Sequence, residues 1–207
     1  IRDANVKPGD NVLEVGPGFG ALTGRLLKSG ARVVAIEFDR KISAWLREKL
    51  VPDGLTLIDG DACKVDIGSI FGKGVPFRLI SNLPYSAGTV VVANMLELET
   101  PPADMFIMLQ KEVGLRLAAK TDDDDYGSLS VRMQALYDVN VVKTIPPELF
   151  YPQPEIDSCI VRLKLKPSLP DIAFRKSFFK LVKAAFMHRR KKMFKQIATL
   201  FPKEKVE

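Results

Sequence analysis

The sequence predicts an α/β fold: a mostly parallel sheet covered by helices on both faces, with an antiparallel pair of strands at one edge. Up to residue 109, short apolar or β-branched runs alternate with stretches of helical spacing. Two more strand-like runs then follow each other closely, which favours an antiparallel pair. The chain of 207 residues is long enough for one such domain and a small appendage.

Five predicted strands come first, and a polar or glycine-rich segment ends each of them. The predicted strands are residues 11–15, 32–36, 55–58, 77–81 and 105–109. Gly30 stands where the helix predicted over 21–28 ends, and Asp39 can cap the next helix. Ligands of parallel sheets bind beyond the carboxyl ends of the strands, so the residues just after these strands are site candidates.

The last third of the chain changes pattern. Residues 139–145 and 156–166 form the antiparallel pair, joined by a proline-rich connection over 146–154. Beyond Pro170 the spacing is helical. An apolar stripe, opposite Arg175, Lys176, Lys180 and Lys183, is formed by Phe174, Phe178, Leu181, Val182 and Ala185. We therefore expect a main domain over 1–167 and a small basic helical segment over 168–207.

The net charge of +6 is concentrated at the C-terminal end. Residues 1–100 balance 12 basic against 12 acidic side chains, whereas residues 160–207 carry 14 basic and 3 acidic ones. Such an excess suggests a polyanion partner, most commonly nucleic acid, although a solvated helix face has the same composition. The candidate contacts for such a partner are Arg189, Arg190, Lys191, Lys192 and Lys195. The single histidine, His188, is expected to belong to this basic surface.

Several classes of protein are disfavoured. Cys63 and Cys159 lie far apart without CxxC spacing, which argues against a disulfide framework and a cysteine-rich zinc site, and no other metal-ligand cluster is apparent. No apolar run is long enough to cross a bilayer, and no signal peptide is evident. We expect a cytoplasmic protein with reduced thiols. Residues 1–5 read like the end of a helix, so we also expect a segment to precede them.

The residues after the first strand predict a cofactor site. Gly16, Gly18 and Gly20 form a turn that lets the backbone pass close to a ligand. A dinucleotide site would favour the pattern G-x-G-x-x-G, but position 21 is alanine. Glu14 suits a cofactor with a cationic amino-acid tail and would repel a pyrophosphate.

Carboxylates follow the next two strands. Glu37 can accept both hydroxyls of a ribose, a role that serves NAD and S-adenosylmethionine alike. Asp61, which Ala62 follows, can accept the exocyclic amine of an adenine. A single such residue is most often an exposed loop carboxylate, but three in order after three consecutive strands indicate a cofactor site.

The run Ser81-Asn82-Leu83-Pro84-Tyr85 after the fourth strand predicts chemistry on an adenine amine. The N6 lone pair is delocalised into the ring, so acceptors for both N–H groups would restore its nucleophilicity. Asn82 offers its side-chain carbonyl. Pro84 holds Leu83 extended, which can aim the Leu83 backbone carbonyl at the same amine. Tyr85 offers a ring face to an extruded base.

In combination these motifs resemble the KsgA-type rRNA adenine dimethyltransferase family, which includes the erythromycin-resistance rRNA methylases. The resemblance runs from Val12 to about Leu165 and includes LEVGPGFGALT at 13–23, AIEFD at 35–39, GDA at 60–62, NLPY at 82–85, QKEV at 110–113, YGSLS at 126–130, F-x-P-x-P at 150–154 and Ile156-Asp157-Ser158. The family's Gln-x-Phe-Leu segment before the first strand is absent, and its C-terminal helical domain is longer than 168–207.

The resemblance implies a Rossmann-like class I methyltransferase fold with S-adenosyl-L-methionine as cofactor and S-adenosyl-L-homocysteine as product. The glycines would line the methionine part, while Glu37 and Asp61 would hold the ribose and adenine. The 82–85 run would hold the target adenine, and Phe150 would stack on it opposite Tyr85. The family adds two methyl groups to each of two adjacent adenines near the 3′ end of small-subunit rRNA, in ribosome biogenesis.

Three other functions remain open from the sequence. A large-subunit rRNA methylase of the resistance type would share the pocket, although Pro17 in the glycine turn and Leu83 favour the small-subunit type. A non-catalytic nucleic-acid-binding relative is the second, and the intact Glu37 and 82–85 run argue against it. A DNA N6-adenine methyltransferase is the third, and a comparison of DNA and RNA substrates would distinguish it. We expect a monomer that acts on small-subunit rRNA within an assembling 30S particle.

Overall fold

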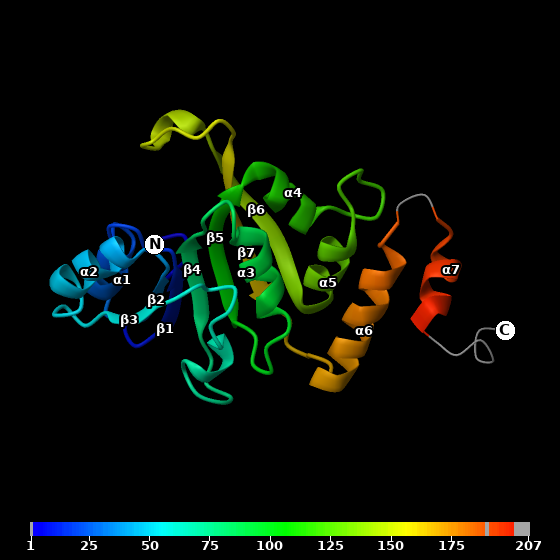
Figure 1. Ribbon diagram of the computed structural model, residues 1–207, viewed down its shortest axis with the longest axis horizontal. Coiled ribbons are helices and arrows are strands. Elements are labelled where there is room, and N and C mark those ends of the chain that lie inside the picture. Colours follow the sequence, from blue (N-terminus) through cyan, green and yellow to red (C-terminus); the bar gives the residue numbers. More distant parts are fainter. Residues whose placement is uncertain (1, 189–190, 201–207) are drawn as a thin grey trace.

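The computed structural model describes residues 2–188 and 191–200, and within them seven strands form one sheet (Figure 1). The strands are β1 (Asn11–Val15), β2 (Arg32–Glu37), β3 (Thr56–Asp59), β4 (Arg78–Asn82), β5 (Asp104–Gln110), β6 (Tyr137–Ile145) and β7 (Ser158–Leu165). Their order is β3-β2-β1-β4-β5-β7-β6. The five neighbours from β3 to β5 are parallel, so the predicted α/β class is confirmed.

The antiparallel pair is also confirmed, and its arrangement adds a detail. β7 lies between β5 and β6 and runs antiparallel to both, so β6 is the edge strand. The first residue of β7, Ser158, pairs with Gln110 at the end of β5. The connection that precedes Ser158 therefore lies beside the carboxyl ends of the parallel strands.

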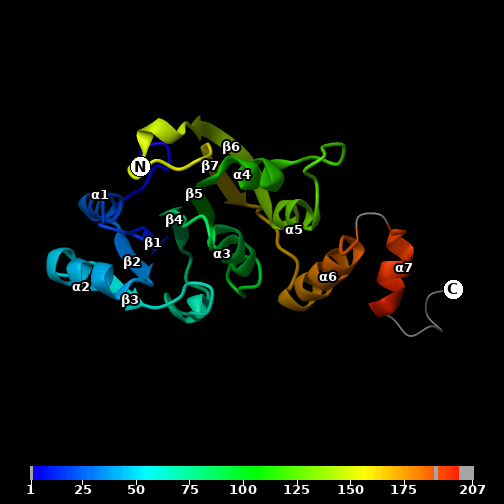
Figure 2. The ribbon, with the colours of Figure 1, turned by 45° about the horizontal axis from the view of Figure 1, so that its top comes forward.

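Helices cover both faces of the sheet (Figure 2). Leu26 of α1 (Thr23–Lys28) and Leu46 of α2 (Arg40–Lys49) pack in the core on one face. The other face is covered by α3 (Gly88–Met95), α4 (Lys111–Ala118) and α5 (Ser128–Leu136). Short 3₁₀ turns stand at η1 (Ile67–Ser69), η2 (Pro147–Leu149) and η3 (Ala198–Leu200). Asp39 caps α2 as predicted, since its carboxylate accepts from the backbone N–H of Lys41 and Ile42.

The C-terminal helices are α6 (Ile172–Ala185) and α7 (Met193–Ile197). The predicted apolar stripe of α6 is partly wrong. Phe174 is exposed, whereas Arg175 is buried and Phe179 lies in the core of the sheet domain. The Arg175 guanidinium donates to the carbonyls of Leu98 (3.2 Å) and Glu99 (3.0 Å), which follow α3. These carbonyls account for the buried arginine, and the division at 167/168 stays a prediction.

Candidate active site

The glycine turn between β1 and α1 has a backbone that other residues would not adopt without strain. Gly16, Gly18 and Gly20 all have positive φ, of 67°, 54° and 72°. The Gly16 N–H donates to the carbonyl of Ile36 (2.9 Å), which ties the turn to the end of β2. The turn therefore presents bare backbone at the carboxyl ends of two neighbouring strands.

Gly16 also touches the turn that follows β4. A Cβ atom at Gly16 would lie 2.8 Å from Cγ of Pro84, closer than real atoms approach. The glycine loop and the 82–85 turn are thus in van der Waals contact, although 66 residues of sequence separate Gly16 from Asn82. The sheet order explains this proximity, because β1 and β4 are neighbours.

A pocket of about 450 Å³, here called the glycine-loop pocket, lies at this edge of the sheet. Its volume falls in the range of small-molecule sites. The carboxyl ends of β1, β2 and β3 and the start of α3 contribute its lining, which is Val15, Gly16, Ile36, Glu37, Phe38, Asp39, Gly60, Asp61, Ala62, Cys63, Pro84, Ser86 and Ala87. Four residues predicted for the cofactor, Gly16, Glu37, Asp61 and Ala62, come together here.

The Glu37 carboxylate is held by backbone N–H groups. Its Oε1 accepts from Phe38 and Asp39, both at 2.9 Å, and its Oε2 accepts from Gly18 at 3.4 Å. The side chain is buried except for a small fraction. The carboxylate is therefore oriented before any ligand arrives, with its longer bond on the Oε2 side.

Asp61 presents an ionised carboxylate to the same pocket. Its Oδ1 accepts from the backbone N–H of Cys63 (2.9 Å), and this hydrogen bond lowers the pKa of Asp61 below its usual range. Lys64 lies 3.5 Å from Oδ2. An ionised carboxylate is an acceptor only, so Asp61 can accept from an amine but not donate to it.

Glu14 lies apart from the glycine-loop pocket lining. It is 2% exposed and accepts from the Thr23 hydroxyl at 2.7 Å. Burial raises the pKa of Glu14 to about 7, and the hydrogen bond from Thr23 offsets this only in part. The carboxyl group thus titrates near neutral pH behind the glycine turn.

The 82–85 turn connects β4 to α3. The Leu83 N–H donates to the carbonyl of Met108 on β5 (2.9 Å), and the Leu83 side chain is buried. The Pro84 carbonyl accepts from the N–H of Gly88 (2.8 Å), which begins α3. Asn82 is exposed, and no hydrogen bond to its side chain occurs within the part of the chain that the structure describes. Its amide is therefore available to a ligand.

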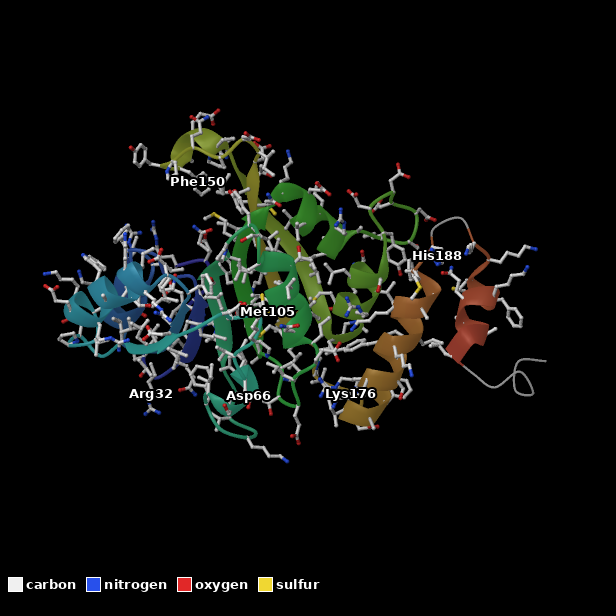
Figure 3. All side chains as sticks on the ribbon, in the orientation of Figure 1. Arg32, Asp66, Met105, Phe150, Lys176 and His188 are labelled. Carbon is white, nitrogen blue, oxygen red and sulfur yellow. The ribbon has the colours of Figure 1, made fainter. Side chains whose placement is uncertain are left out.

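A second pocket, here called the turn pocket, has a volume of about 300 Å³. Its lining joins the turn to the β6–β7 connection and consists of Gly16, Asn82, Leu83, Pro84, Tyr85, Phe150, Pro152 and Pro154. Figure 3 shows Phe150 on this connection, beyond the strand ends. All five residues predicted to hold the target base, Phe150 included, therefore line one pocket.

The two pockets share two walls, Gly16 and Pro84. A ligand in the glycine-loop pocket and a ligand in the turn pocket would meet across these two residues. The arrangement suits transfer of a small group from one ligand to the other, because it holds both near one point.

The predicted basic surface lies elsewhere. Lys191, Lys192 and Lys195 line a cavity of about 580 Å³ together with His188, while Arg189 and Arg190 lie outside the described residues. Both views place α6 and α7 at the end of the molecule opposite α1 and α2 (Figures 1 and 2). The three lysines thus lie together, away from the two pockets, and their contact with a nucleic acid stays a prediction.

Sequence patterns did not assign roles to several residues of the site. Ser158 appeared only within a family motif, yet its hydroxyl is hydrogen bonded to the Tyr85 hydroxyl (2.5 Å). Cys63, Ser86 and Ala87 line the glycine-loop pocket. Their only sequence signal was their place just after a strand or beside a recognised motif.

Neither a metal cluster nor a membrane span occurs among the described residues. Within residues 2–188 and 191–200, no three or more His, Cys, Asp or Glu side chains form a group that could hold a metal ion. None of the helices in these ranges combines the length and apolar character that a bilayer crossing requires.

Comparisons with known proteins agree with this geometry. The model of the family "Ribosomal RNA adenine dimethylase" matches residues 1–207. The ribosomal RNA small subunit methyltransferase A of Bacillus cytotoxicus is 38% identical over 211 residues, covering 98% of this chain and 72% of that protein. The protein of the same name from Clostridium acetobutylicum is 38% identical over 193 residues, covering 92% and 70%.

Solved structures are similar as well. A dimethyladenosine transferase from Plasmodium falciparum has a TM-score of 0.78 at 26% identity, covering 95% of this chain and 70% of that one. The 23S rRNA methyltransferase ErmE has a TM-score of 0.71 at 25% identity, covering 98% and 81%. With the whole chain matched by the family model, and with a Rossmann-like methyltransferase fold, this protein belongs to the ribosomal RNA adenine dimethylase family.

Proposed function

We propose that this protein uses S-adenosyl-L-methionine to dimethylate N6 of two adjacent adenines near the 3′ end of small-subunit (16S) rRNA, releasing S-adenosyl-L-homocysteine. One observation carries the proposal. The glycine-loop pocket and the turn pocket share Gly16 and Pro84, so a cofactor in the first and a base in the second would lie side by side. An rRNA adenine substrate follows from the family.

The residues of the glycine-loop pocket fit this cofactor. When bound, S-adenosylmethionine supplies a methyl group that its sulfonium sulfur has already activated. Glu37, oriented by three backbone N–H groups, would accept from the ribose hydroxyls, and Asp61 with Ala62 would hold the adenine. The cradle for the methionine part would be formed by Gly16, Gly18 and Gly20, with Glu14 behind it.

The turn pocket supplies acceptors for an amine. The Asn82 side-chain carbonyl and the Leu83 backbone carbonyl would accept from the two N–H groups of adenine N6, which returns the lone pair to nitrogen. Pro84 has no N–H that could compete, and it keeps Leu83 extended. Tyr85 and Phe150 would hold the base by stacking, as proteins commonly hold extruded bases. Catalysis then consists of in-line positioning and preorganised dipoles.

The small-subunit target is supported by the relatives. Two relatives at 38% identity are named as small subunit methyltransferases, whereas the 23S rRNA methyltransferase is 25% identical. The basic surface at Lys191, Lys192 and Lys195, with Arg189 and Arg190 outside the described residues, would contact rRNA phosphates. We further propose that the protein acts as a cytoplasmic monomer on an assembling 30S particle.

Methyl transfer to undermethylated small subunits tests the proposal. The wild-type protein should label them from methyl-labelled S-adenosylmethionine, with the label mapping to adjacent adenines. Asn82→Ala should lower the rate by about 100-fold, the usual effect of removing one preorganised partner, while cofactor affinity stays unchanged. The control is Asn140→Ala, an exposed asparagine on β6.

Three results would contradict the proposal. Turnover by Asn82→Ala at the wild-type rate would overturn the mechanism. Label in large-subunit rRNA would identify an enzyme of the resistance type. RNA binding without any transfer by the wild-type protein would identify a non-catalytic relative.

A further inference from the structure

The hydroxyl of Tyr85 is fixed by a hydrogen bond, whereas its ring is partly accessible. Its side chain is 36% exposed and lines the turn pocket, while its hydroxyl is hydrogen bonded to the hydroxyl of Ser158 (2.5 Å). The hydrogen bond joins residues 73 positions apart in the sequence. A phenylalanine would provide the same ring face, so the phenol group must be explained by something other than stacking.

Ser158 is buried within the sheet, and the two neighbouring strands fix its position. It is 0% exposed and is the first residue of β7, where its backbone pairs with Gln110 on β5 and Ile145 on β6. A buried hydroxyl without a partner is costly, and among the described residues Tyr85 is the hydrogen-bond partner of this one. The geometry suits a fixed anchor for a more exposed side chain.

The residue before Ser158 is fastened twice. The Lys111 N–H donates to the Asp157 carbonyl (2.9 Å), and Lys111 Nζ donates to Asp157 Oδ2 (2.9 Å). These bonds hold the start of β7 against the start of α4. They also fix one end of the connection that carries Phe150. Ser158 therefore contacts Tyr85 directly and follows the residue that fixes the end of the connection carrying Phe150.

We propose that Ser158 is a positioning residue for methyl transfer: its buried hydroxyl fixes the ring of Tyr85 in the orientation that receives the target base. The inference rests on the proposed function, since it assigns Tyr85 to the base site. A ring fixed in advance loses less freedom when the base arrives, and this raises the rate of transfer more than it changes the affinity for RNA.

Kinetics test the proposal with Ser158→Ala, Tyr85→Phe and the double variant. Each single variant should lower the single-turnover rate with saturating RNA and S-adenosylmethionine by roughly tenfold, the equivalent of one hydrogen bond. The double variant should be no slower than Tyr85→Phe, because the hydroxyl that Ser158 holds is already absent. Cofactor affinity should not change. The proposal would be overturned if Ser158→Ala lowered the rate equally in the wild type and in Tyr85→Phe, or if it did not lower the rate of the wild type.

A matched control separates positioning from stability. Ser130 is likewise 0% exposed, and its hydroxyl donates to the carbonyl of Arg116 (2.6 Å), away from both pockets. Ser130→Ala should lower the melting temperature as Ser158→Ala does, but it should leave the transfer rate unchanged. A rate loss from Ser130→Ala equal to that from Ser158→Ala would mean that the effect is one of stability.

A measurement that does not involve methyl transfer distinguishes failure of this proposal from failure of the proposed function. In protein with labelled tyrosine, NMR should detect a slowly exchanging Tyr85 hydroxyl proton in the wild type and lose it in Ser158→Ala. Absence of this proton from the wild type would overturn the positioning role even if methyl transfer occurs. Its presence in a wild type that transfers no methyl group would support the anchor and count against the proposed function alone.

Discussion

Replacing Glu14 by glutamine should stabilise the protein at alkaline pH and leave its stability at acid pH nearly unchanged. Burial raises the pKa of Glu14 from 4.5 to about 7 in the folded protein. The folded state therefore keeps a proton that the unfolded chain releases between these values. The contribution to stability is complete below about pH 4.5 and is lost as the pH rises through about 7.

The magnitude follows from the two pKa values. A tenfold change in proton affinity is worth about 1.4 kcal/mol, so the difference between 4.5 and about 7 corresponds to a loss of about 3 kcal/mol. Glutamine resembles the protonated acid and does not titrate, and its carbonyl can still accept from Thr23. The advantage of the variant in unfolding free energy should grow by this amount between about pH 5 and pH 8.

Urea unfolding of both proteins across this pH range measures the effect. Glu48→Gln is the control, because Glu48 is exposed and its hydrogen bond with Lys49 lowers rather than raises its pKa. If wild type and Glu14→Gln lose stability in parallel with rising pH, Glu14 does not titrate near neutrality and the reasoning is refuted. Calorimetry of cofactor binding measures a second consequence. Because ionised Glu14 would attract the cationic amino-acid tail of the cofactor, cofactor affinity should rise with pH through about 7 in the wild type but not in the variant.

Two further changes test other parts of the molecule. Gly16→Ala should cost about 1–2 kcal/mol from its positive φ alone, and its collision with the neighbouring turn should weaken both cofactor binding and transfer; an unaltered cofactor affinity in calorimetry would contradict the shared wall. Replacing Lys191, Lys192 and Lys195 by glutamine should flatten the salt dependence of RNA binding, by about 0.7–0.9 in the log–log slope for each phosphate that is no longer neutralised. A slope equal to that of the wild type would assign these lysines to solubility.

Local patterns predicted the parallel part of the fold well. Each of the first five strands lies within one residue of its predicted bounds, because every strand combines β-branched or apolar residues with a polar stop. The helix α3 gave no clear stripe, because Val90 is apolar although it is 47% exposed, so apolar residues occur outside the buried face that Val91, Val92 and Met95 form. Periodicity detects a helix whose exposed face is polar, and the exposed face of α3 carries a valine.

Features that depend on contacts between residues distant in the sequence could not be predicted from local patterns. The burial of Arg175 depends on two carbonyls 76 and 77 residues away, and no local pattern in α6 encodes them. The candidate site could be assembled from strand order, because parallel neighbours bring their carboxyl ends together. The place of β7 between β5 and β6 could not, and without it Ser158 had no visible link to Tyr85.

The attachment of α6 has a consequence for how RNA binding can be studied. Phe179 fills part of the same core as the sheet, and Lys183 and Arg132 both approach Glu97 (3.1 and 4.0 Å). Cutting the chain at residue 167 would leave a void in place of the Phe179 ring and would remove the ion pair between Lys183 and Glu97, which follows α3. A loss of RNA binding by the shortened protein would therefore reflect a destabilised core as well as the missing lysines. Substitutions at the surface lysines change the charge alone.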